Sequence, residues 1–344
     1  MIAIRVYAVN AALTMATFLC LPALALGSGT VPLIYSSDLY HPHGDPDDHF
    51  DLMTLFALPE FDIRAIVVDM GEGGKGRPGI PALKQLLHLT GRDVPYATGL
   101  LENLRSPEDQ ALEQPQADQA AVQLVLKALH EAQAAVTIFT TGSLRDMAAA
   151  FNREPSLFRE KVARFYVNAG WVGEKMEWNV QLDPRAYVRI LESGLPLYWA
   201  PCFGEEGYGT LWSFRHEAVL ASCAAPIRNF FLYMLTKADP KQTAPIAFLH
   251  GEVPKEAVAK FWPLERRMWC TGPFLHAAGR IEPSFTFKKL DVSLRSDGHT
   301  PVVGSGQGLA LNTFHVEDPE AYPKAMTEVL RQLFTSLALT EQAD

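Results

Sequence analysis

Apolar and polar positions follow two alternating patterns through the first two thirds of the chain. Short apolar runs rich in β-branched and aromatic residues are typical of buried strands. These runs lie at 31–37, 63–69, 95–97, 135–142, 164–170 and 195–202. The longer segments between them have helical periodicity and lie at 49–58, 80–91, 120–132, 144–155 and 184–193. Strands this apolar, separated by helices, predict a mainly parallel sheet that helices cover on both faces.

Beyond residue 211 the pattern becomes mostly helical. Residues 214–237, 256–269 and 319–337 have helical periodicity, whereas 285–294 predicts a hairpin at the edge of the sheet. The chain contains no internal repeat and no Gly/Ser-rich linker. We therefore expect an α/β fold with a Rossmann-like open sheet and a helical C-terminal part, formed by a single domain over residues 26–344.

Composition and charge exclude several classes of protein. The 344 residues are 48% hydrophobic and 20% charged, which is ordinary for a globular protein and argues against disorder. The net charge is −9 and no Lys/Arg block occurs, so nucleic-acid binding is not expected. Cys202, Cys223 and Cys270 allow at most one internal disulfide, and their spacing is not that of a zinc site.

The N-terminal segment has the layout of a secretory signal peptide. Arg5 precedes an apolar stretch, which ends at the small-residue sequence Ala23-Leu24-Ala25. We expect residues 1–25 to be removed and the product to be secreted or periplasmic, although a membrane anchor is the alternative. No later segment has the length and apolarity of a membrane span, so no membrane association is expected after removal.

The sequence DPDDHFDL at 45–52 places Asp45, Asp47 and Asp48 between a predicted strand and a predicted helix. Asp51 lies one turn into that helix, and Asp38 ends the strand. Converging carboxylates repel each other unless a cation lies among them, and oxygen ligands favour a hard cation such as calcium or magnesium. Capping of the helix by Asp45 or Asp47 would explain only one or two of these residues. The neighbouring His43 is a weaker candidate for contact with a substrate.

Several blocks, taken in order, resemble one known family. They are the acidic turn, then 78–100, TTGSLRDMAAAFNREP (140–155), YVNAGW (166–171), MEWNVQLDPRAYVRILESGLPL (176–197) and FHVEDPEAY (314–322). Together they resemble the calcium-dependent nucleoside hydrolases of the inosine–uridine preferring type. The resemblance implies their fold, and it implies metal-dependent hydrolysis of the N-glycosidic bond in a nucleoside or related ribosyl compound. It also suggests a homo-oligomer.

The resemblance also assigns roles to individual residues. Asp48 would be the main calcium ligand, supported by Asp45 and by the backbone carbonyl of Thr141, and Asp47 would face the ribose hydroxyls. The sugar would also be bound by Asn168, Glu177 and Asn179, with His43 as a further candidate. The base that takes a proton from the attacking water would be Asp45 or Asp38.

Three departures from the family's pattern concern the site itself. The opening turn is longer, and the loop at 70–79 lacks the family's asparagine. Where the family has a late His-Asp pair, this chain offers His276-Ala277. Either the calcium loses a carboxylate ligand, or His276, Asp51 or water takes its place. The alternatives to a nucleoside hydrolase are a calcium-dependent sugar or nucleoside binder without turnover, and a hydrolase of another glycoside. Trp171 and Trp178 are candidates to stack on a base or a sugar, and a place in the apolar core is the alternative.

Overall fold

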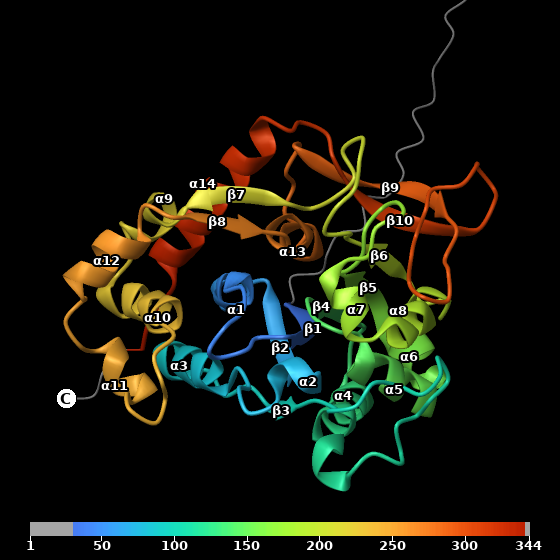
Figure 1. Cartoon of the computed structure of the whole chain (residues 1–344), viewed down its shortest axis with the longest axis horizontal. Coiled ribbons are helices and arrows are strands. Elements are labelled where there is room, and N and C mark those ends of the chain that lie inside the picture. Colours follow the sequence, from blue (N-terminus) through green and yellow to red (C-terminus); the bar gives the residue numbers. More distant parts are fainter. Residues whose placement is uncertain (1–29, 341–344) are drawn as a thin grey trace, which may run out of the picture.

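The core of the fold is an eight-stranded sheet in a computed structural model that describes residues 30–340 (Figure 1). The strand order is β3-β2-β1-β4-β5-β6-β10-β9. The strands are β1 (Val31–Ser37), β2 (Phe61–Val68), β3 (Tyr96–Thr98), β4 (Val136–Thr140), β5 (Val162–Val167), β6 (Leu197–Trp199), β9 (Phe285–Val292) and β10 (Leu309–Val316). All neighbours pair in parallel except β9 and β10, which are antiparallel. The predicted parallel sheet is confirmed.

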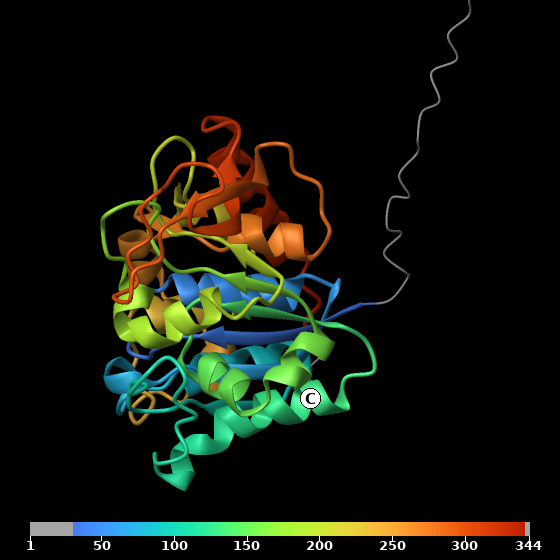
Figure 2. The same ribbon diagram turned by 90° about the vertical axis from the view of Figure 1, so that its right-hand side faces the viewer.

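Helices cover both faces of the sheet, as Figure 2 shows from the side. Because successive strand residues point to opposite faces, Leu33 and Tyr35 enter one apolar core and Ile34 enters the other. The first core is completed by α1 (Asp47–Ala57), α3 (Ile80–Thr90), α10 (Ala225–Leu235), α13 (Thr271–Ala277) and α14 (Ala321–Ser336). The second is completed by α4 (Ala120–Glu131), α5 (Arg145–Arg153), α6 (Pro155–Lys161) and α8 (Pro184–Leu191).

The helix predicted at 80–91 shows how local sequence sets an element's end. Helix α3 ends at Thr90, and Gly91 follows in the left-handed region with φ of 61°. Glycine adopts this conformation without the penalty that a Cβ atom imposes, so it commonly ends helices. The remaining short helices are α2 (Gly71–Gly74), α7 (Trp178–Leu182), α9 (His216–Leu220), α11 (Pro245–Leu249) and α12 (Lys255–Phe261), with a 3-10 turn at Gln116–Gln119.

The C-terminal part is less helical than predicted. The segment 214–237 begins inside strand β7 (Trp212–Arg215), and 256–269 ends in strand β8 (Glu265–Met268). These two strands form a small antiparallel sheet. The segment 285–294 is an edge strand, as expected, and it pairs antiparallel with the next strand of the chain, β10. Sequence periodicity did not detect β7 and β8, because short strands owe their formation to pairing with a remote partner.

Strand β1 lies at the point where the strand order reverses. It pairs with β2 on one side and with β4 on the other, so the loops after β1 and β4 leave the same edge of the sheet in different directions. Ligands of open parallel sheets bind in the crevice at such a point. Gly142 lets the loops approach closely, because a Cβ atom there would lie 2.7 Å from the backbone nitrogen of Asp38.

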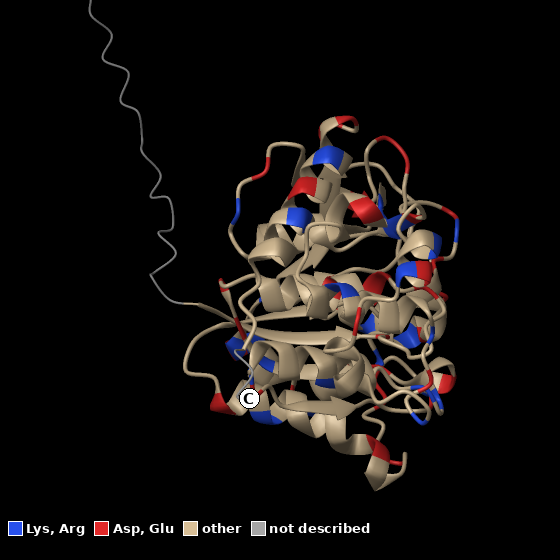
Figure 3. Cartoon of the chain, turned by 90° about the vertical axis from the view of Figure 1, so that its left-hand side faces the viewer, with Lys and Arg blue, Asp and Glu red and all other residues tan. Residues whose placement is uncertain are grey.

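Two expectations about location meet the structure only in part. Among residues 30–340, no helix is long and apolar enough to cross a membrane. The signal peptide expected at 1–25 lies outside the described residues. On the side shown in Figure 3, acidic and basic residues are interspersed and no purely basic face is formed.

Candidate active site

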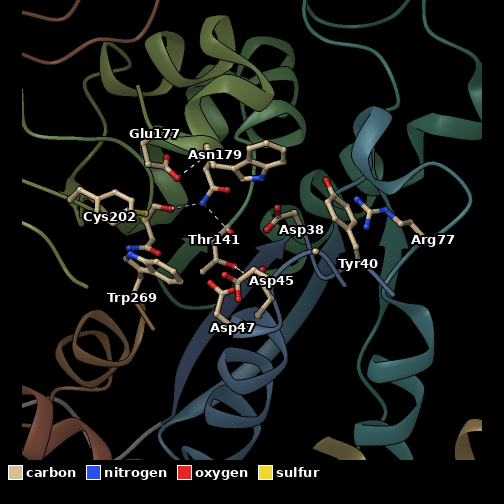
Figure 4. A pocket seen from close by; sticks show the side chains of 15 residues that line it. Asp38, Tyr40, Asp45, Asp47, Arg77, Thr141, Glu177, Asn179, Cys202 and Trp269 are labelled. Atoms are coloured by element: carbon tan, nitrogen blue, oxygen red, sulfur yellow. Dashed lines mark hydrogen bonds between the residues drawn. The ribbon is translucent and has the colours of Figure 1, made fainter. Parts of the chain in front are cut away.

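A cavity of about 430 Å³ opens at the carboxyl ends of β1, β4 and β5, which is within the usual size for a small-molecule site (Figure 4). Its walls come from segments that are far apart in the sequence. The lining residues are Asp38, Tyr40, Gly44, Asp45, Asp47, Asp48, Arg77, Thr141, Asn168, Glu177, Trp178, Asn179, Cys202, Phe203 and Trp269. Eight of the predicted site residues, Asp38 included, are thus brought together, whereas His43, His276 and Asp51 do not line the cavity.

Asp48 is a carboxylate of the cavity that two hydroxyl groups hold in place. It lies in the first turn of α1, is buried, and its Oδ1 accepts hydrogen bonds from Ser37 Oγ at 2.6 Å and from Thr141 Oγ1 at 2.9 Å. The Tyr35 hydroxyl lies 2.9 Å from the same Thr141 oxygen. These contacts fix one oxygen of Asp48 toward the ends of β1 and β4.

Asp38 and Asp47 lie close enough to Asp48 to perturb each other's ionisation. Burial raises the pKa of Asp38 well above its usual range, and the charges of Asp48, Asp69 and Asp47 raise it further. Burial likewise raises the pKa of Asp47, with Asp48 as the next cause. Carboxylates close enough to perturb each other's ionisation favour a shared proton or a bound cation. This part of the cavity therefore has the electrostatics of a cation site.

Asp45 occupies a different environment from its neighbours. Its side chain is 52% exposed, and its Oδ1 lies 2.6 Å from Arg266 NH2 on β8. This pairing argues against the predicted role of Asp45 as a metal ligand, because its charge is already neutralised at the cavity mouth. The alternative of helix capping by Asp45 or Asp47 finds no support either: the residue before α1 is Pro46, and no side chain caps this end.

The side chains assigned to the sugar form one hydrogen-bonded group. Glu177 precedes α7, and its carboxylate accepts hydrogen bonds from the backbone nitrogens of Gly170, Asn179 and Val180 at 2.9, 2.9 and 3.3 Å. Asn179 Nδ2 donates to the carbonyl oxygens of Thr141 and Asn168 at 3.3 and 3.2 Å. Burial raises the pKa of Glu177, although these backbone donors oppose the shift.

The donors of this cavity fit a hard cation in their chemistry. Asp38, Asp47 and Asp48 offer carboxylate oxygens, and the carbonyl of Thr141 is a neutral oxygen beside them. Within the described residues, however, no group of three or more His, Cys, Asp and Glu side chains is placed to hold a metal ion. Binding would therefore have to draw the carboxylates together around the ion. The mutual repulsion that raises their pKa values is what a cation would relieve.

His276 is not at the site, which corrects its assignment as a metal ligand. It does not line the cavity; its Nδ1 lies 2.7 Å from the Tyr166 hydroxyl, and its ring packs on Tyr198 and Phe287. Burial lowers the pKa of His276 to about 4. The cause is the position on α13: Cys270 and Thr271 begin this helix near the cavity, whereas His276 lies one and a half turns further on.

His43 also lies behind the cavity rather than in its lining. It is buried, and its ring packs near His49 with ring centroids 6.2 Å apart. Burial lowers the pKa of His43 to about 4, and the charge of Lys237 acts in the same direction. Contact of His43 with a substrate is therefore not supported by its placement.

Sequence reasoning missed the wall formed by Cys202, Phe203 and Trp269 and the opposite edge formed by Tyr40 and Arg77. Asp38, Asp47 and Asp48 form the acidic centre of the cavity. Figure 4 shows Trp269 and Cys202 on one side of this centre and Tyr40 and Arg77 on the other. These residues belong to loops without a recognisable motif, so no local signal marks them. The Cys270 thiol, next to Trp269, donates to Asn168 Oδ1 at 2.8 Å.

Asp51 was a candidate to complete the metal site, and the structure places it beneath the cavity. It is fully buried and does not line the cavity. Burial raises the pKa of Asp51 well above its usual range, and the charge of Asp48 adds to this, whereas the nearby Cys270 thiol opposes it. Asp51 is thus a supporting group behind Asp48 rather than a residue that faces a ligand.

A buried ionic network supports the site from below. Arg145, at the start of α5, contacts Asp69 at 3.4 Å and Asp183 at 3.3 Å, and all three side chains are at most 2% exposed. Asp69 follows β2 and also accepts a hydrogen bond from the backbone nitrogen of Ser143 at 2.8 Å. Asp183 precedes α8 and accepts from the backbone nitrogen of Leu104 at 2.8 Å. The network therefore joins the loops after β2 and β4 to the helices that follow Glu177.

Several solved structures with the same fold are nucleoside hydrolases. The inosine-uridine preferring nucleoside hydrolase of Bacillus anthracis matches with a TM-score of 0.52 at 15% identity, covering 88% of this chain and 100% of that one. The purine-preferring ribonucleoside hydrolase of Gardnerella vaginalis matches with a TM-score of 0.53 at 15% identity, covering 88% and 99%. At this level of identity the likeness shows the fold.

Sequence comparison identifies relatives over part of the chain. Pyrimidine-specific ribonucleoside hydrolase RihA of Citrobacter koseri is 29% identical over 191 residues, and the protein of that name from Escherichia coli O1:K1 is equally similar. The matched part is 49% of this chain and spans about 59% of the length of the Citrobacter relative. The model of the inosine-uridine preferring nucleoside hydrolase family matches residues 43–258, more than half of the chain. The chain therefore belongs to the inosine-uridine preferring nucleoside hydrolase family.

Proposed function

We propose that this protein hydrolyses the N-glycosidic bond of a ribonucleoside or related ribosyl compound, with calcium as its cofactor. The observation that carries the proposal is the convergence of Asp38, Asp47 and Asp48 with Glu177 and Asn179 on one cavity at the switch point of the sheet. Nucleoside hydrolases of this family are metal-dependent, typically on calcium. The names of the relatives support a nucleoside as the substrate.

Asp48, Asp47 and the carbonyl of Thr141 are the groups that would hold the ion. Calcium bound there would supply positive charge that lowers the pKa of an attacking water. We assign the base to Asp38 rather than Asp45, because Asp38 lies beside Asp48 within the acidic centre whereas Asp45 is paired with Arg266. The carboxylate of Asp38 takes the proton from water as the water oxygen bonds to the anomeric carbon. The C–N bond breaks, and its electron pair stays on the nitrogen of the departing group.

The remaining polar residues bind and orient the sugar. Asn168 and Asn179 have side chains anchored by backbone carbonyls, which gives them fixed positions in the cavity wall. The negative charges of Asp47 and Glu177 stabilise an anomeric carbon that becomes positive in an oxocarbenium-like transition state. Because backbone groups hold Asn168, Asn179 and Glu177 in place, these residues need little rearrangement when the sugar binds.

A calcium-dependent sugar or nucleoside binder is the second candidate. It is favoured by the segment before α13, which brings Trp269 and Cys270 to the site instead of the His-Asp pair that the family resemblance implied. Loss of a carboxylate ligand would weaken calcium binding, and loss of an imidazole would remove a proton donor.

We further propose secretion by means of residues 1–25, a single domain over 26–344 and a homo-oligomeric state.

The test measures free ribose released by the protein from uridine, inosine and an N-ribosyl pyridinium, with calcium and after chelation. We expect calcium-dependent release, and we expect Asp38→Asn to lower it by about 100-fold or more because the base is lost. Asp62→Asn is the control, since Asp62 forms a surface ion pair with Arg64 away from the cavity. Full activity of Asp38→Asn would remove Asp38 as the base. Calcium binding without ribose from any compound would leave the binder.

A further inference from the structure

The outer part of the cavity is an aromatic compartment. Trp269 meets Phe203 edge-on with ring centroids 6.0 Å apart, and Phe203 stacks on Trp171 at 4.8 Å. Tyr40 lies across the acidic centre (Figure 4). The guanidinium carbon of Arg77 lies over its ring, 4.8 Å from the ring centroid. Trp178 also lines the cavity and is 61% exposed. An exposed indole at a cavity mouth is free to cover a flat ligand, as aromatic rings do in binding sites.

Apart from the carboxyl groups already assigned to the ion, the water and the sugar, the lining offers no group suited to protonate a departing base. The lining residues of the described chain include no histidine. The Tyr40 hydroxyl is engaged with the carbonyl oxygen of Met70 at 3.1 Å, and burial raises its pKa. Burial also raises the pKa of the Cys202 thiol well above its usual range. Arg77 donates hydrogen bonds but does not release a proton at neutral pH. Neutral nucleobases are poor leaving groups unless they are protonated. This lining is therefore poorly suited to the hydrolysis of nucleosides with a neutral base.

The charge of the lining favours a cation. Five carboxylic acids face the cavity, namely Asp38, Asp45, Asp47, Asp48 and Glu177, against the single guanidinium of Arg77. When all five acids are ionised, four of the five negative charges are offset. A bound divalent ion offsets two, Arg77 offsets one, and Arg266, the partner of Asp45, offsets one. Negative charge beside exposed aromatic rings is the environment in which proteins bind organic cations, through cation–π attraction.

We propose, resting on the function proposed above, that the substrate is an N-ribosyl pyridinium. In such a compound the aromatic nitrogen heterocycle is positively charged while it is attached to the ribose. In its hydrolysis the water oxygen bonds to the anomeric carbon and Asp38 takes the proton. The C–N bond breaks, and its electron pair returns to the ring nitrogen, so the heterocycle departs as a neutral pyridine. No proton donor is needed on the leaving-group side, which matches the lining of this compartment.

The first experiment compares kcat/KM for ribose release from N-ribosyl pyridinium-3-carboxamide, uridine and inosine by the calcium-loaded protein. Each value is divided by the uncatalysed rate of the same compound, because a pyridinium is intrinsically the more reactive. We expect the ratio of kcat/KM to the uncatalysed rate to be about tenfold or more greater for the pyridinium than for uridine or inosine. A tenfold difference corresponds in free energy to one of the stronger cation–π interactions. Equal or greater enhancement with uridine or inosine would overturn the substrate assignment and leave the hydrolase intact. No ribose from any compound would overturn both proposals.

A second measurement tests the aromatic compartment directly. Trp178→Leu changes an exposed side chain and so preserves the fold, and Trp269→Leu changes the inner wall. We expect each variant to lower kcat/KM for the pyridinium about tenfold, with a smaller loss for inosine, since a neutral ring forfeits only stacking. Ile281→Ala, at a 98% exposed residue outside the cavity lining, is the control. Unchanged pyridinium kinetics in Trp178→Leu would contradict the proposal even if Trp269→Leu failed to fold.

Discussion

At the scale of single residues, one residue type performs different tasks according to its surroundings. Asp45 is half exposed and paired with Arg266, Asp48 is buried and held by two hydroxyl groups, and Asp51 is fully buried behind it. Asp51 is only six positions after Asp45 in the sequence. The helical turn between them directs neighbouring side chains to different faces, so proximity in sequence does not give them a common role.

Calcium binding should depend on Asp48 and hardly on Asp45. Asp48→Asn removes one negative charge from the acidic centre, and we expect the dissociation constant for calcium to rise by about tenfold or more. Asp45→Asn is the matched control, because the charge that it removes is exposed and already paired. Isothermal titration with calcium measures both. Equal weakening by the two variants would show that the ion lies at the cavity mouth instead.

At the scale of elements, a short helix is positioned by one buried acid. Helix α7 has five residues, too few to be stable by itself, and the Glu177 carboxylate bonds to the backbone nitrogens of Asn179 and Val180 at its start. The same carboxylate binds the backbone nitrogen of Gly170, which follows β5. Glu177 thus ties the helix that carries Asn179 to the edge of the sheet.

Removing this acceptor should cost stability as well as substrate affinity. Glu177→Ala leaves three backbone donors without their partner, and we expect the free energy of unfolding to fall by about 1–3 kcal/mol. Glu177→Gln retains one acceptor oxygen and should lose less. Urea unfolding gives the stability, and Glu192→Ala, at an exposed position after α8, is the control. A stability loss no larger than that of the control would mean that water replaces the carboxylate.

At the scale of the whole molecule, the Arg145 network joins elements that the chain visits at widely separated points. Its carboxylates follow β2 and precede α8, and its guanidinium also bonds to the carbonyl oxygens of Leu100 and Leu182. The two loops that carry Thr141 and Glu177 are therefore coupled through one buried cation. Burial of so many charges is tolerated because each has partners within hydrogen-bonding distance.

Loss of this cation should destabilise the entire domain. Arg145→Met would leave Asp69 and Asp183 buried without their counter-ion, and we expect a loss of about 3–5 kcal/mol in the free energy of unfolding. Arg64→Met, which removes an exposed arginine paired with Asp62, should change it by less than about 0.5 kcal/mol. Thermal unfolding of both variants provides the comparison, and equal melting temperatures would refute the role given to Arg145.

Local sequence determined much of this fold. The apolar runs placed β1 at its observed residues and β2, β4 and β5 within a few residues, because burial on both faces makes most positions of a strand apolar. Gly91 fixed the end of α3, since few other residues adopt its conformation. The family blocks supplied Asp48, Thr141, Asn168, Glu177 and Asn179, all of which line the cavity.

Only the tertiary structure decided what surrounds those residues. The pairing of β7 with β8 brings Arg266 to Asp45 and Trp269 to the cavity, across more than two hundred residues of chain. The turn of α13 takes His276 away to Tyr166 and leaves Cys270 near Asn168. Such contacts depend on how separate elements pack, and a local pattern contains no information about a partner that distant. The sequence by itself therefore determined the strands and the acidic centre, and packing decided which charges are neutralised and what faces the substrate.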